Sequence, residues 1–188
     1  AAQTHQTAVE QRTELVISGP TSSSVAVRLT SSVLIEIIRS ARTSLLVVSF
    51  AAYGVAEVIE ELCSAAARGV RIDLVLEGSA SSGGTLRGQA GSSATFSPLK
   101  DVAAFWHWPA HRRPATGTSR SALHAKFIAA DATVALITSA NLTDRALSTN
   151  LEVGVVLRDP VVTERLVQHF AALMQPTFGV LERLPLNH

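Results

Sequence analysis

The pattern of apolar and polar positions is clearest between residues 44 and 77. The run TSLLVVSF, at 43–50, is a short apolar strand pattern rich in β-branched and large residues. After this strand, apolar residues recur at the spacing of one helix face, which predicts a helix: Val55, Val58, Ile59, Leu62, Cys63 and Ala66. Gly69 is placed to end this helix, and VRIDLVL, at 70–76, alternates into a second strand. A buried strand, a crossover helix and another strand predict a parallel pair in an α/β sheet.

Further elements are predicted on both sides of this unit. Strand patterns lie at 102–109, 121–130, 132–139 and 150–157. A helix is predicted at about 31–42, with a serine capping its first turn. Another helix begins at Asp159 and Pro160, a cap followed by a first-turn proline, and ends at Pro176. Its apolar stripe contains Val162, Leu166, Phe170 and Leu173.

These elements predict an α/β fold, in which a mixed, largely parallel β-sheet is flanked by helices on both faces. With 188 residues, of which 47% are hydrophobic, the chain is long enough to bury the core of one domain, which we expect to span 1–188. The segment 77–93 is rich in serine and glycine. We expect it to form a surface loop.

Composition excludes several classes of site. The net charge of +1 is too small for the whole-protein field to predict binding to nucleic acid or membranes. Because Cys63 is the only cysteine, no intramolecular disulfide or multi-cysteine metal site can form, and its helical position predicts a buried thiol. The longest mostly apolar run, at 45–56, is too short to span a bilayer, and no signal peptide is visible. We therefore expect a cytoplasmic protein without membrane contact.

A group of polar residues lies on, or directly after, three of the predicted strands. His124 and Lys126 would share one face of a strand, roughly 7 Å apart, where an imidazole and an ammonium can converge on one small anion. Ser139 and Asn141 follow the next strand and can donate hydrogen bonds to the same anion. Glu152, on the third strand, could hold the other ring nitrogen of the histidine and raise its basicity.

This set of side chains suits phosphoryl chemistry. An imidazole can attack phosphorus, lysine and amide donors can stabilise charge on the phosphate oxygens, and a carboxylate can orient the imidazole. No pair of carboxylates resembles a magnesium site, so the predicted chemistry needs neither a metal nor a cofactor.

The same residues resemble a known motif. His124-x-Lys126-x4-Asp131, followed by Ser139-x-Asn141 and Glu152, resembles the HKD motif of the phospholipase D superfamily, and its spacing is similar to that of small bacterial nucleases with one motif per chain. The resemblance extends over roughly residues 30–175. More narrowly, five segments together resemble the phospholipase D-like component of the DISARM antiphage system: SFAAYGV, AAARGVRI, the WP-containing segment VAAFWHWP, LHAK and TSANLTDRAL.

The resemblance implies a phospholipase D-like fold and a role for each residue of the motif. It implies a covalent phosphohistidine on His124, phosphate binding by Lys126 and Asn141, and support from Ser139. It also implies that Glu152 orients the histidine. Asp131 would have a structural role near the strand turn. One departure is Thr138, where glycine is usual; threonine fits only if the backbone needs no positive φ.

The family needs two histidines in each active site, one as nucleophile and one as general acid. None of the other histidines has a lysine two residues later; they are His5, His107, His111, His169 and His188. The simplest completion is a homodimer in which His124 of each chain faces the other across a shared cleft.

Two clusters near the motif have alternative interpretations. Arg112, Arg113 and Arg120 could clamp a phosphate backbone at the rim of the cleft, or belong to a solvated loop. Trp106 and Trp108 alternate on one face of their strand and could stack a base, although the large area that each ring buries favours packing in the core or at an interface.

Three functions are consistent with the motif. The first is a metal-independent phosphodiesterase that acts on nucleic acid, with DNA as the expected substrate, alongside other components of an antiphage system. The second is a binding module that holds backbone phosphate without turnover. The third is a lipid phosphodiesterase, which the lack of an amphipathic basic helix disfavours.

Overall fold

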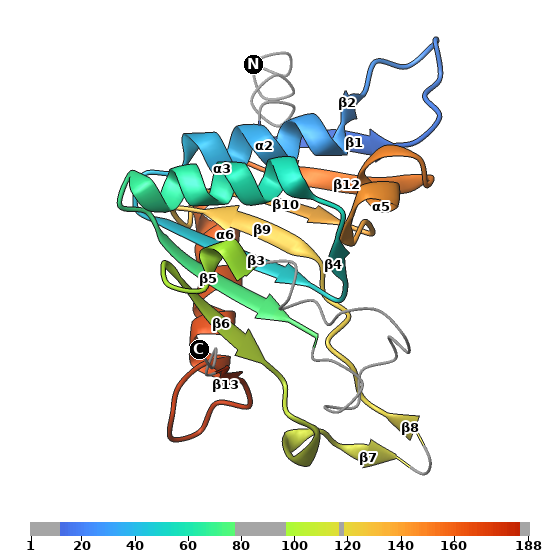
Figure 1. Ribbon diagram of the computed structural model, residues 1–188. Coiled ribbons are helices and arrows are strands. Elements are labelled where there is room, and N and C mark those ends of the chain that lie inside the picture. Colours follow the sequence, from blue (N-terminus) through green and yellow to red (C-terminus); the bar gives the residue numbers. More distant parts are fainter. Residues whose placement is uncertain (1–11, 78–96, 117–118, 185–188) are drawn as a thin grey trace.

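The computed structural model of the protein describes residues 12–77, 97–116 and 119–184 (Figure 1). Apart from Glu77, the serine- and glycine-rich segment at 77–93 lies outside these ranges. The described residues form a nine-stranded sheet in the order β13-β6-β5-β3-β9-β10-β12-β1-β2. Helices cover both faces of this mixed sheet, which confirms the predicted α/β class.

The elements have the following bounds in chain order. The strands of the main sheet are β1 (Thr13–Ser18), β2 (Arg28–Leu29), β3 (Ser44–Ser49), β5 (Arg71–Leu76), β6 (Ala103–His107), β9 (Phe127–Ala130), β10 (Val134–Thr138), β12 (Glu152–Leu157) and β13 (Glu182–Arg183). The helices are α2 (Thr30–Ser40), α3 (Ala56–Ala67), α5 (Asp144–Ser148) and α6 (Pro160–Leu173), with 3₁₀ turns η2 (Ser97–Leu99) and η3 (Ala110–Arg112). Short two-stranded pairs join β4 (Ala52–Tyr53) to β11 (Leu142–Thr143) and β7 (Ala115–Thr116) to β8 (Ser119–Arg120).

The predicted βαβ unit is confirmed. Strands β3 and β5 pair in parallel over their whole lengths, from Ser44 opposite Arg71 to Ser49 opposite Leu76, and α3 connects them. Gly69 adopts a φ of +86°, the left-handed conformation that ends a helix at little steric cost. Strand β6 continues the parallel block beside β5.

Neighbouring strands are antiparallel from β3 to β1, whereas β2 pairs in parallel with β1 at one edge of the sheet and β13 pairs antiparallel with β6 at the other. Strand β9 runs antiparallel to β3 and β10, and β12 runs antiparallel to β10 and β1. The sequence analysis did not predict β1, and it began the strand at 121–130 too early. In the structure β9 begins at Phe127, and residues 121–126 before it are assigned to no helix or strand.

Two apolar clusters form the core, one on each face of the sheet, where the helices pack against it. On one face, α2 and α3 pack residues such as Ile38 and Leu62 against the sheet. On the other, Phe170 of α6 contacts Phe127 of β9 edge to face, with ring centroids 4.9 Å apart. Cys63 is only partly buried against the first cluster, although a buried thiol was expected.

Two predicted helix features differ in detail from the structure. The residue before α2 is Leu29, and no side chain caps this end, so the predicted serine cap is wrong. The predicted cap of α6 is present, because the Asp159 carboxylate accepts hydrogen bonds from the backbone of Val161 and Val162. Val162 itself is 49% exposed and lies outside the buried stripe of α6. None of the helices in the described ranges is long and apolar enough to cross a membrane.

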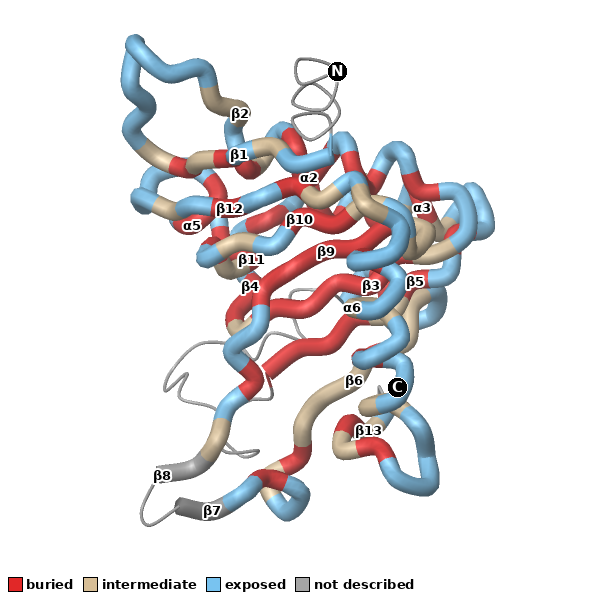
Figure 2. Tube along the Cα trace, turned by 180° about the vertical axis from the view of Figure 1, so that it is seen from behind, coloured by how far each residue is buried: buried red, intermediate tan, exposed pale blue. Residues whose placement is uncertain are grey.

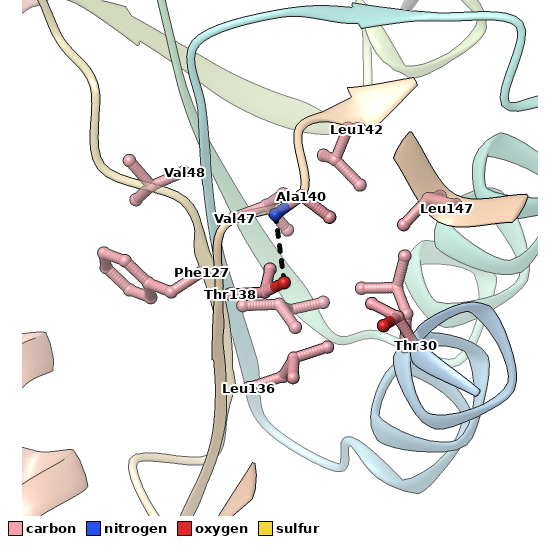
Figure 3. A pocket seen from close by; sticks show the side chains of 11 residues that line it. Thr30, Val47, Val48, Phe127, Leu136, Thr138, Ala140, Leu142 and Leu147 are labelled. Atoms are coloured by element: carbon pink, nitrogen blue, oxygen red, sulfur yellow. Dashed lines mark hydrogen bonds between the residues drawn. The ribbon is translucent and has the colours of Figure 1, made fainter. Parts of the chain in front are cut away.

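A small apolar cavity remains where α2 meets the sheet (Figure 3). Its lining comes from α2, β3, β9, β10 and the chain after β10, including Thr30, Val47, Phe127 and Leu136. The cavity volume is about 20 Å³, room for no more than about one water molecule. It is therefore a packing defect and not a substrate site.

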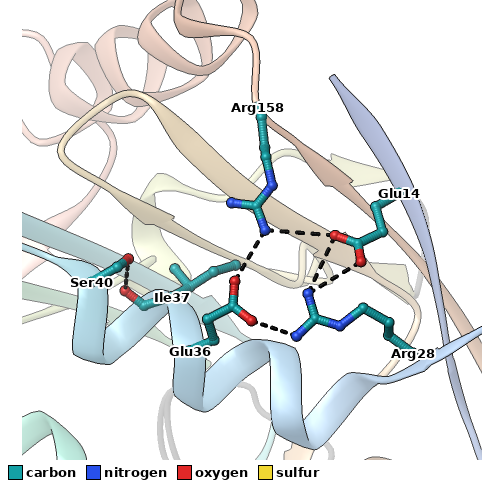
Figure 4. Close-up of polar contacts among 6 residues, drawn as sticks. All are labelled: Glu14, Arg28, Glu36, Ile37, Ser40 and Arg158. Atoms are coloured by element: carbon teal, nitrogen blue, oxygen red, sulfur yellow. Dashed lines mark hydrogen bonds and ion pairs between the residues drawn. The ribbon is translucent and has the colours of Figure 1, made fainter. Parts of the chain in front are cut away.

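A network of ion pairs joins the edge strands to α2 (Figure 4). Arg28 binds both Glu14 and Glu36, and Arg158 lies 3.1 Å from the Glu36 carboxylate and 3.6 Å from that of Glu14. All four side chains are partly exposed, so each pair contributes only about 0–1 kcal/mol. Their position at the end of the sheet indicates that the network chiefly holds β1 and β2 against α2.

Candidate active site

His124 and Lys126 lie side by side just before β9. The Lys126 ammonium is 3.1 Å from Nδ1 of His124 and donates a hydrogen bond of 2.8 Å to the His124 carbonyl. The imidazole is exposed, whereas Lys126 is only 8% exposed. Burial lowers the pKa of Lys126, and the nearby Glu152 carboxylate partly offsets this effect.

The contact with Lys126 determines which nitrogen of His124 carries the proton. A charged ammonium has no lone pair, so Nδ1 must accept the hydrogen bond. A neutral His124 ring in this arrangement therefore carries its proton on Nε2. Nucleophilic attack through Nε2 would require the proton to move to Nδ1, where an acceptor such as a carboxylate would have to hold it.

Ser139 and Glu152 meet where β10 ends and β12 begins. The Ser139 hydroxyl donates to Oε2 of Glu152 at 2.5 Å and accepts a hydrogen bond from the backbone of Val153. Oε1 of Glu152 accepts a longer bond, 3.3 Å, from the Asn150 amide. Within the described ranges no hydrogen bond joins Glu152 to His124 of the same chain, so the expected orienting contact is not made inside one chain.

Asn141 and Thr138 complete this end of the sheet. The side-chain oxygen Oδ1 of Asn141 is buried and has no hydrogen-bond partner among the described residues, so the amide still has bonding capacity. Thr138 has no positive φ, and its hydroxyl accepts a bond from the Ala140 backbone at 3.0 Å (Figure 3). The replacement of the usual glycine by threonine therefore causes no backbone strain.

Asp131 lies at the opposite end of β9, away from the exposed imidazole. Its carboxylate accepts hydrogen bonds from the backbone of Arg42, Thr43 and Ser44 and from the Thr43 hydroxyl, at 2.8–2.9 Å. Burial alone would raise the pKa of Asp131, but these hydrogen bonds outweigh burial and lower it. The contacts join the turn after β9 to the start of β3.

Phe50 is a residue of the site that the sequence analysis did not identify. Its ring centroid lies 5.2 Å from that of His124, at a tilt of 48°, and the Lys126 ammonium lies 5.9 Å from the same centroid. The ring therefore packs against both groups and supports the histidine from one side. The only available signal was its place at the end of the β3 pattern.

The structure separates the members of the arginine cluster. The Arg113 side chain is fully buried in an ion pair with Glu77, so it cannot clamp a phosphate at the rim of the cleft. The Arg112 side chain is 36% exposed and is bound to Glu182 and to the Gly179 carbonyl, and its contact with a substrate remains a prediction. The Arg120 side chain lies outside the described part of the protein.

The two tryptophans belong to the core of the α6 side. Trp106 donates its indole N–H to the Asp73 carboxylate at 2.9 Å, and Trp108 donates to the Arg112 carbonyl at 3.2 Å. Both rings are half-buried against the α6 cluster. Packing, rather than base stacking, accounts for their alternation.

The described side chains form no cluster of metal ligands. Over the described ranges, no three histidine, cysteine, aspartate or glutamate side chains are grouped so that they could hold a metal ion. Glu152 is the one carboxylate of the described site, and it lies near the buried ammonium of Lys126. Because a buried positive charge repels a cation, the site suits an anion.

The sequence matches a known protein family over most of its length. The family described as "Cardiolipin synthase, PLD-like domain" matches residues 34–174, which include every residue of the predicted motif. A search of curated proteins found no match to this sequence.

Solved structures share the fold. NucT from Helicobacter pylori superposes with a TM-score of 0.61 at 15% sequence identity, over 75% of this chain and 84% of that one. A phospholipase D family member, Nuc from Salmonella typhimurium, gives a TM-score of 0.58 at 20% identity, over 85% and 91% of the two chains. The phosphatidylserine synthase of Haemophilus influenzae gives a TM-score of 0.61 at 14% identity over 92% of this chain, but only 39% of its own.

Proposed function

The chain belongs to the family of phospholipase D-like domains described as cardiolipin synthase, and from this we propose that it is a metal-independent phosphodiesterase whose nucleophile is His124. The observation that carries the proposal is the contact between His124 and the buried ammonium of Lys126, which can bind a phosphate oxygen next to the attacking imidazole. The Asn141 amide, just after β10, would supply a further donor to the phosphate. The Ser139 hydroxyl, which donates its one proton to Glu152, would bind the phosphate only after it releases that contact.

We propose that two chains form one active site. A single chain supplies one motif histidine, and its Lys126 favours the tautomer that cannot attack through Nε2. In a two-fold dimer, Glu152 of the partner subunit would accept the Nδ1 proton of His124, which frees Nε2 for attack. The partner's His124 would act as general acid.

The proposed reaction has two steps. In the first, Nε2 of His124 forms a bond to phosphorus, the bond from phosphorus to the leaving oxygen breaks, and the partner's imidazolium gives its proton to that oxygen. In the second, the now neutral imidazole of the partner removes a proton from water, water oxygen bonds to phosphorus, and the phosphohistidine bond breaks. Lys126 stabilises the charge on the phosphate oxygens in both steps.

An exposed apolar face of the sheet offers a surface for the second copy. Leu15, Val155 and Ile137 lie side by side on β1, β12 and β10, and they are 47%, 37% and 42% exposed. Ile137 points to the same side as Ala135, which packs with α6, so α6 covers only part of this face. Figure 2, drawn from the α6 side, shows much of β12 uncovered.

The position of this face favours a second copy as its occupant. Val153, 52% exposed, follows Glu152 directly and is bonded through its backbone to Ser139. Glu152 and Val153 point to opposite faces of the sheet, but the apolar face ends at the same edge of the sheet as the half-site that needs a partner. A copy placed against it would bury the apolar side chains and bring its own motif to the same end of the sheet.

We propose nucleic acid, with DNA first, as the substrate class. The support is the resemblance of the motif and its spacing to single-motif bacterial nucleases, since the buried Arg113 does not contribute. A lipid phosphodiester is the second candidate, because the matching family is described by cardiolipin synthase and one similar structure is a phosphatidylserine synthase.

We also propose a role in antiphage defence beside other components of such a system. Five segments support this role through their resemblance to the DISARM component, among them SFAAYGV and TSANLTDRAL. Loss of protection in cells that carry the His124→Ala protein would support it, and full protection by that variant would contradict a catalytic role in defence.

One experiment separates the substrate classes. The purified protein is incubated with plasmid, short single strands, phosphatidylcholine vesicles and a phosphodiester reporter, with and without EDTA. Cleavage of nucleic acid that survives EDTA and disappears in His124→Ala supports the first proposal. Loss of activity in EDTA would contradict the metal-independent mechanism, turnover of lipid alone would support the lipid enzyme, and binding without cleavage would indicate a binding module.

A further inference from the structure

A buried ion pair lies beneath the chain segment that carries His124. Nη2 of Arg113 is 2.6 Å from Oε1 of Glu77, and both side chains are fully buried. Glu77 directly follows β5, and its backbone N–H donates to the carbonyl of Ser49 at the end of β3. The pair therefore sits at the carboxyl ends of two parallel strands.

Both partners of this pair also hold backbone groups. The second carboxylate oxygen of Glu77 accepts a 2.8 Å hydrogen bond from the backbone N–H of Leu123, the residue before His124. Arg113 donates to the Ser121 carbonyl at 3.1 Å and to the Trp108 carbonyl through Nε at 2.8 Å. One carboxylate and one guanidinium thus fix two points of the segment 121–123.

This segment needs such support because residues 121–125 are assigned to no strand. The sheet holds the chain from Lys126 onward, where the Lys126 carbonyl accepts a 3.2 Å hydrogen bond from the backbone of Thr138, so the chain before His124 depends on contacts outside the sheet. The Leu123 side chain is buried in the α6 cluster, which fixes one side of the chain. The ion pair fixes the backbone through charge-assisted hydrogen bonds, which are shorter and stronger than neutral ones.

We propose that Glu77 and Arg113 are positioning residues that fix the imidazole of His124 through the backbone of residues 121–123. The inference rests on the proposed function, because it treats His124 as the nucleophile. A buried ion pair is often no more stabilising than apolar side chains of similar volume, so stability alone does not account for it. Orientation of the nucleophile does, since a displacement of about 1 Å at a reacting atom can cost about a hundredfold in rate.

The test separates positioning from stability with two variants. Glu77→Gln keeps the shape of the side chain but removes its charge. The double variant Glu77→Leu/Arg113→Met replaces the whole pair with apolar groups and leaves no unpaired buried charge, so it is expected to fold. The matched control is Asp73→Asn, which removes a carboxylate of β5 that binds Trp106 but not the His124 segment.

Two measurements are made on each protein. We expect kcat on a phosphodiester reporter to fall at least about tenfold in both test variants, with KM changed less than about threefold, and to be unchanged in Asp73→Asn. Amide hydrogen exchange at Leu123 should accelerate about tenfold or more in both test variants, while exchange in β3 and β5 stays slow.

Each outcome bears on the proposal. A double variant that folds and keeps wild-type kcat, or wild-type protection of Leu123, would overturn it. An equal loss of kcat in Asp73→Asn would also overturn it, because the effect would then be a general loss of packing. If the wild-type protein turns over no phosphodiester, the proposed function fails, and the exchange at Leu123 still decides whether the pair holds this segment.

Discussion

The ammonium of Lys126 lies 3.1 Å from Nδ1 of His124 and donates to the carbonyl of the same histidine at 2.8 Å. This contact joins the proposed nucleophile to the proposed phosphate ligand within one chain. It is also the reason why one chain alone supports only half of the mechanism, because an Nδ1 that accepts from lysine leaves the proton on Nε2.

Lys126 should set the alkaline limit of activity. Because burial lowers its pKa from the usual 10.5, Lys126 loses its proton at a lower pH than an exposed lysine does. A neutral amine no longer stabilises the phosphate oxygens, so kcat/KM should fall as pH rises, with a midpoint below 10.5. A profile of kcat/KM against pH on a phosphodiester reporter measures this fall, which is the alkaline limb of the profile. Circular dichroism at each pH checks that the protein stays folded.

Two variants serve as controls for this profile. Lys126→Met should reduce kcat by about 10²–10³, as the removal of a transition-state donor does. Lys126→Arg should shift the alkaline limb beyond the accessible range, because arginine stays charged, although its planar fork should lower activity. An unchanged limb in Lys126→Arg would show that another group titrates.

Mixtures of wild-type and His124→Ala chains should reveal the shared site. If each site needs a histidine from both chains, only dimers with two wild-type chains are active. An equal mixture, allowed to exchange subunits, should then keep about one quarter of the activity of the same total amount of wild-type protein. Independent sites would keep about one half, and that result would contradict the shared site.

A charge on the exposed apolar face should separate the chains. Val155→Lys places an ammonium between Leu15 and Ile137, where a second copy would have to bury it unpaired. Light scattering at micromolar concentration should show a dimer for the wild type and a monomer for the variant. Val102→Lys, at a valine that is 51% exposed and belongs to neither β1, β10 nor β12, is the control and should remain dimeric. A dimeric Val155→Lys protein would place the interface elsewhere.

Asp131 should contribute to stability in a pH-dependent way. Its folded-state pKa is lowered, so its contribution is present above its ordinary value of 3.8 and is lost as pH falls through the folded-state pKa. Asp131→Asn should reduce the free energy of unfolding at pH 7 by about 1–2 kcal/mol. This value is at the low end of what hydrogen bonds to charged groups contribute, because the carboxylate is partly exposed to water. Urea denaturation at pH 7 and pH 3 checks this, since the difference between the two proteins should shrink at pH 3.

The apolar pattern predicted those elements whose burial is strongest. The β3–α3–β5 unit and α6 follow from continuous apolar strands, helical spacing, Gly69 and the Asp159 cap. Strand β1 was missed because only alternate residues of TELVIS are deeply buried, and its place depends on distant pairing with β12. Long-range pairing of this kind leaves little local signal in one sequence.

The site was predictable in its residue types but not in all its contacts. The spacing of His124, Lys126, Ser139 and Glu152 follows from strands that end at one edge of the sheet. The burial of Arg113 could not be predicted, because its partner Glu77 is 36 residues away and looks like the start of a polar loop. The one local signal of this ion pair was the charged residue Glu77 directly after the apolar strand β5, since charged side chains are rarely found beside buried apolar segments without a partner.

The most direct test of the central claim is to trap the covalent intermediate. The enzyme in excess is mixed with bis(p-nitrophenyl) phosphate in EDTA, quenched in alkali, in which phosphohistidine survives, and digested for mass spectrometry. The account predicts a p-nitrophenyl phosphoryl adduct on the peptide that contains His124, and neither adduct nor turnover in His124→Ala. Turnover that persists in His124→Ala, or an adduct on another residue, would contradict it.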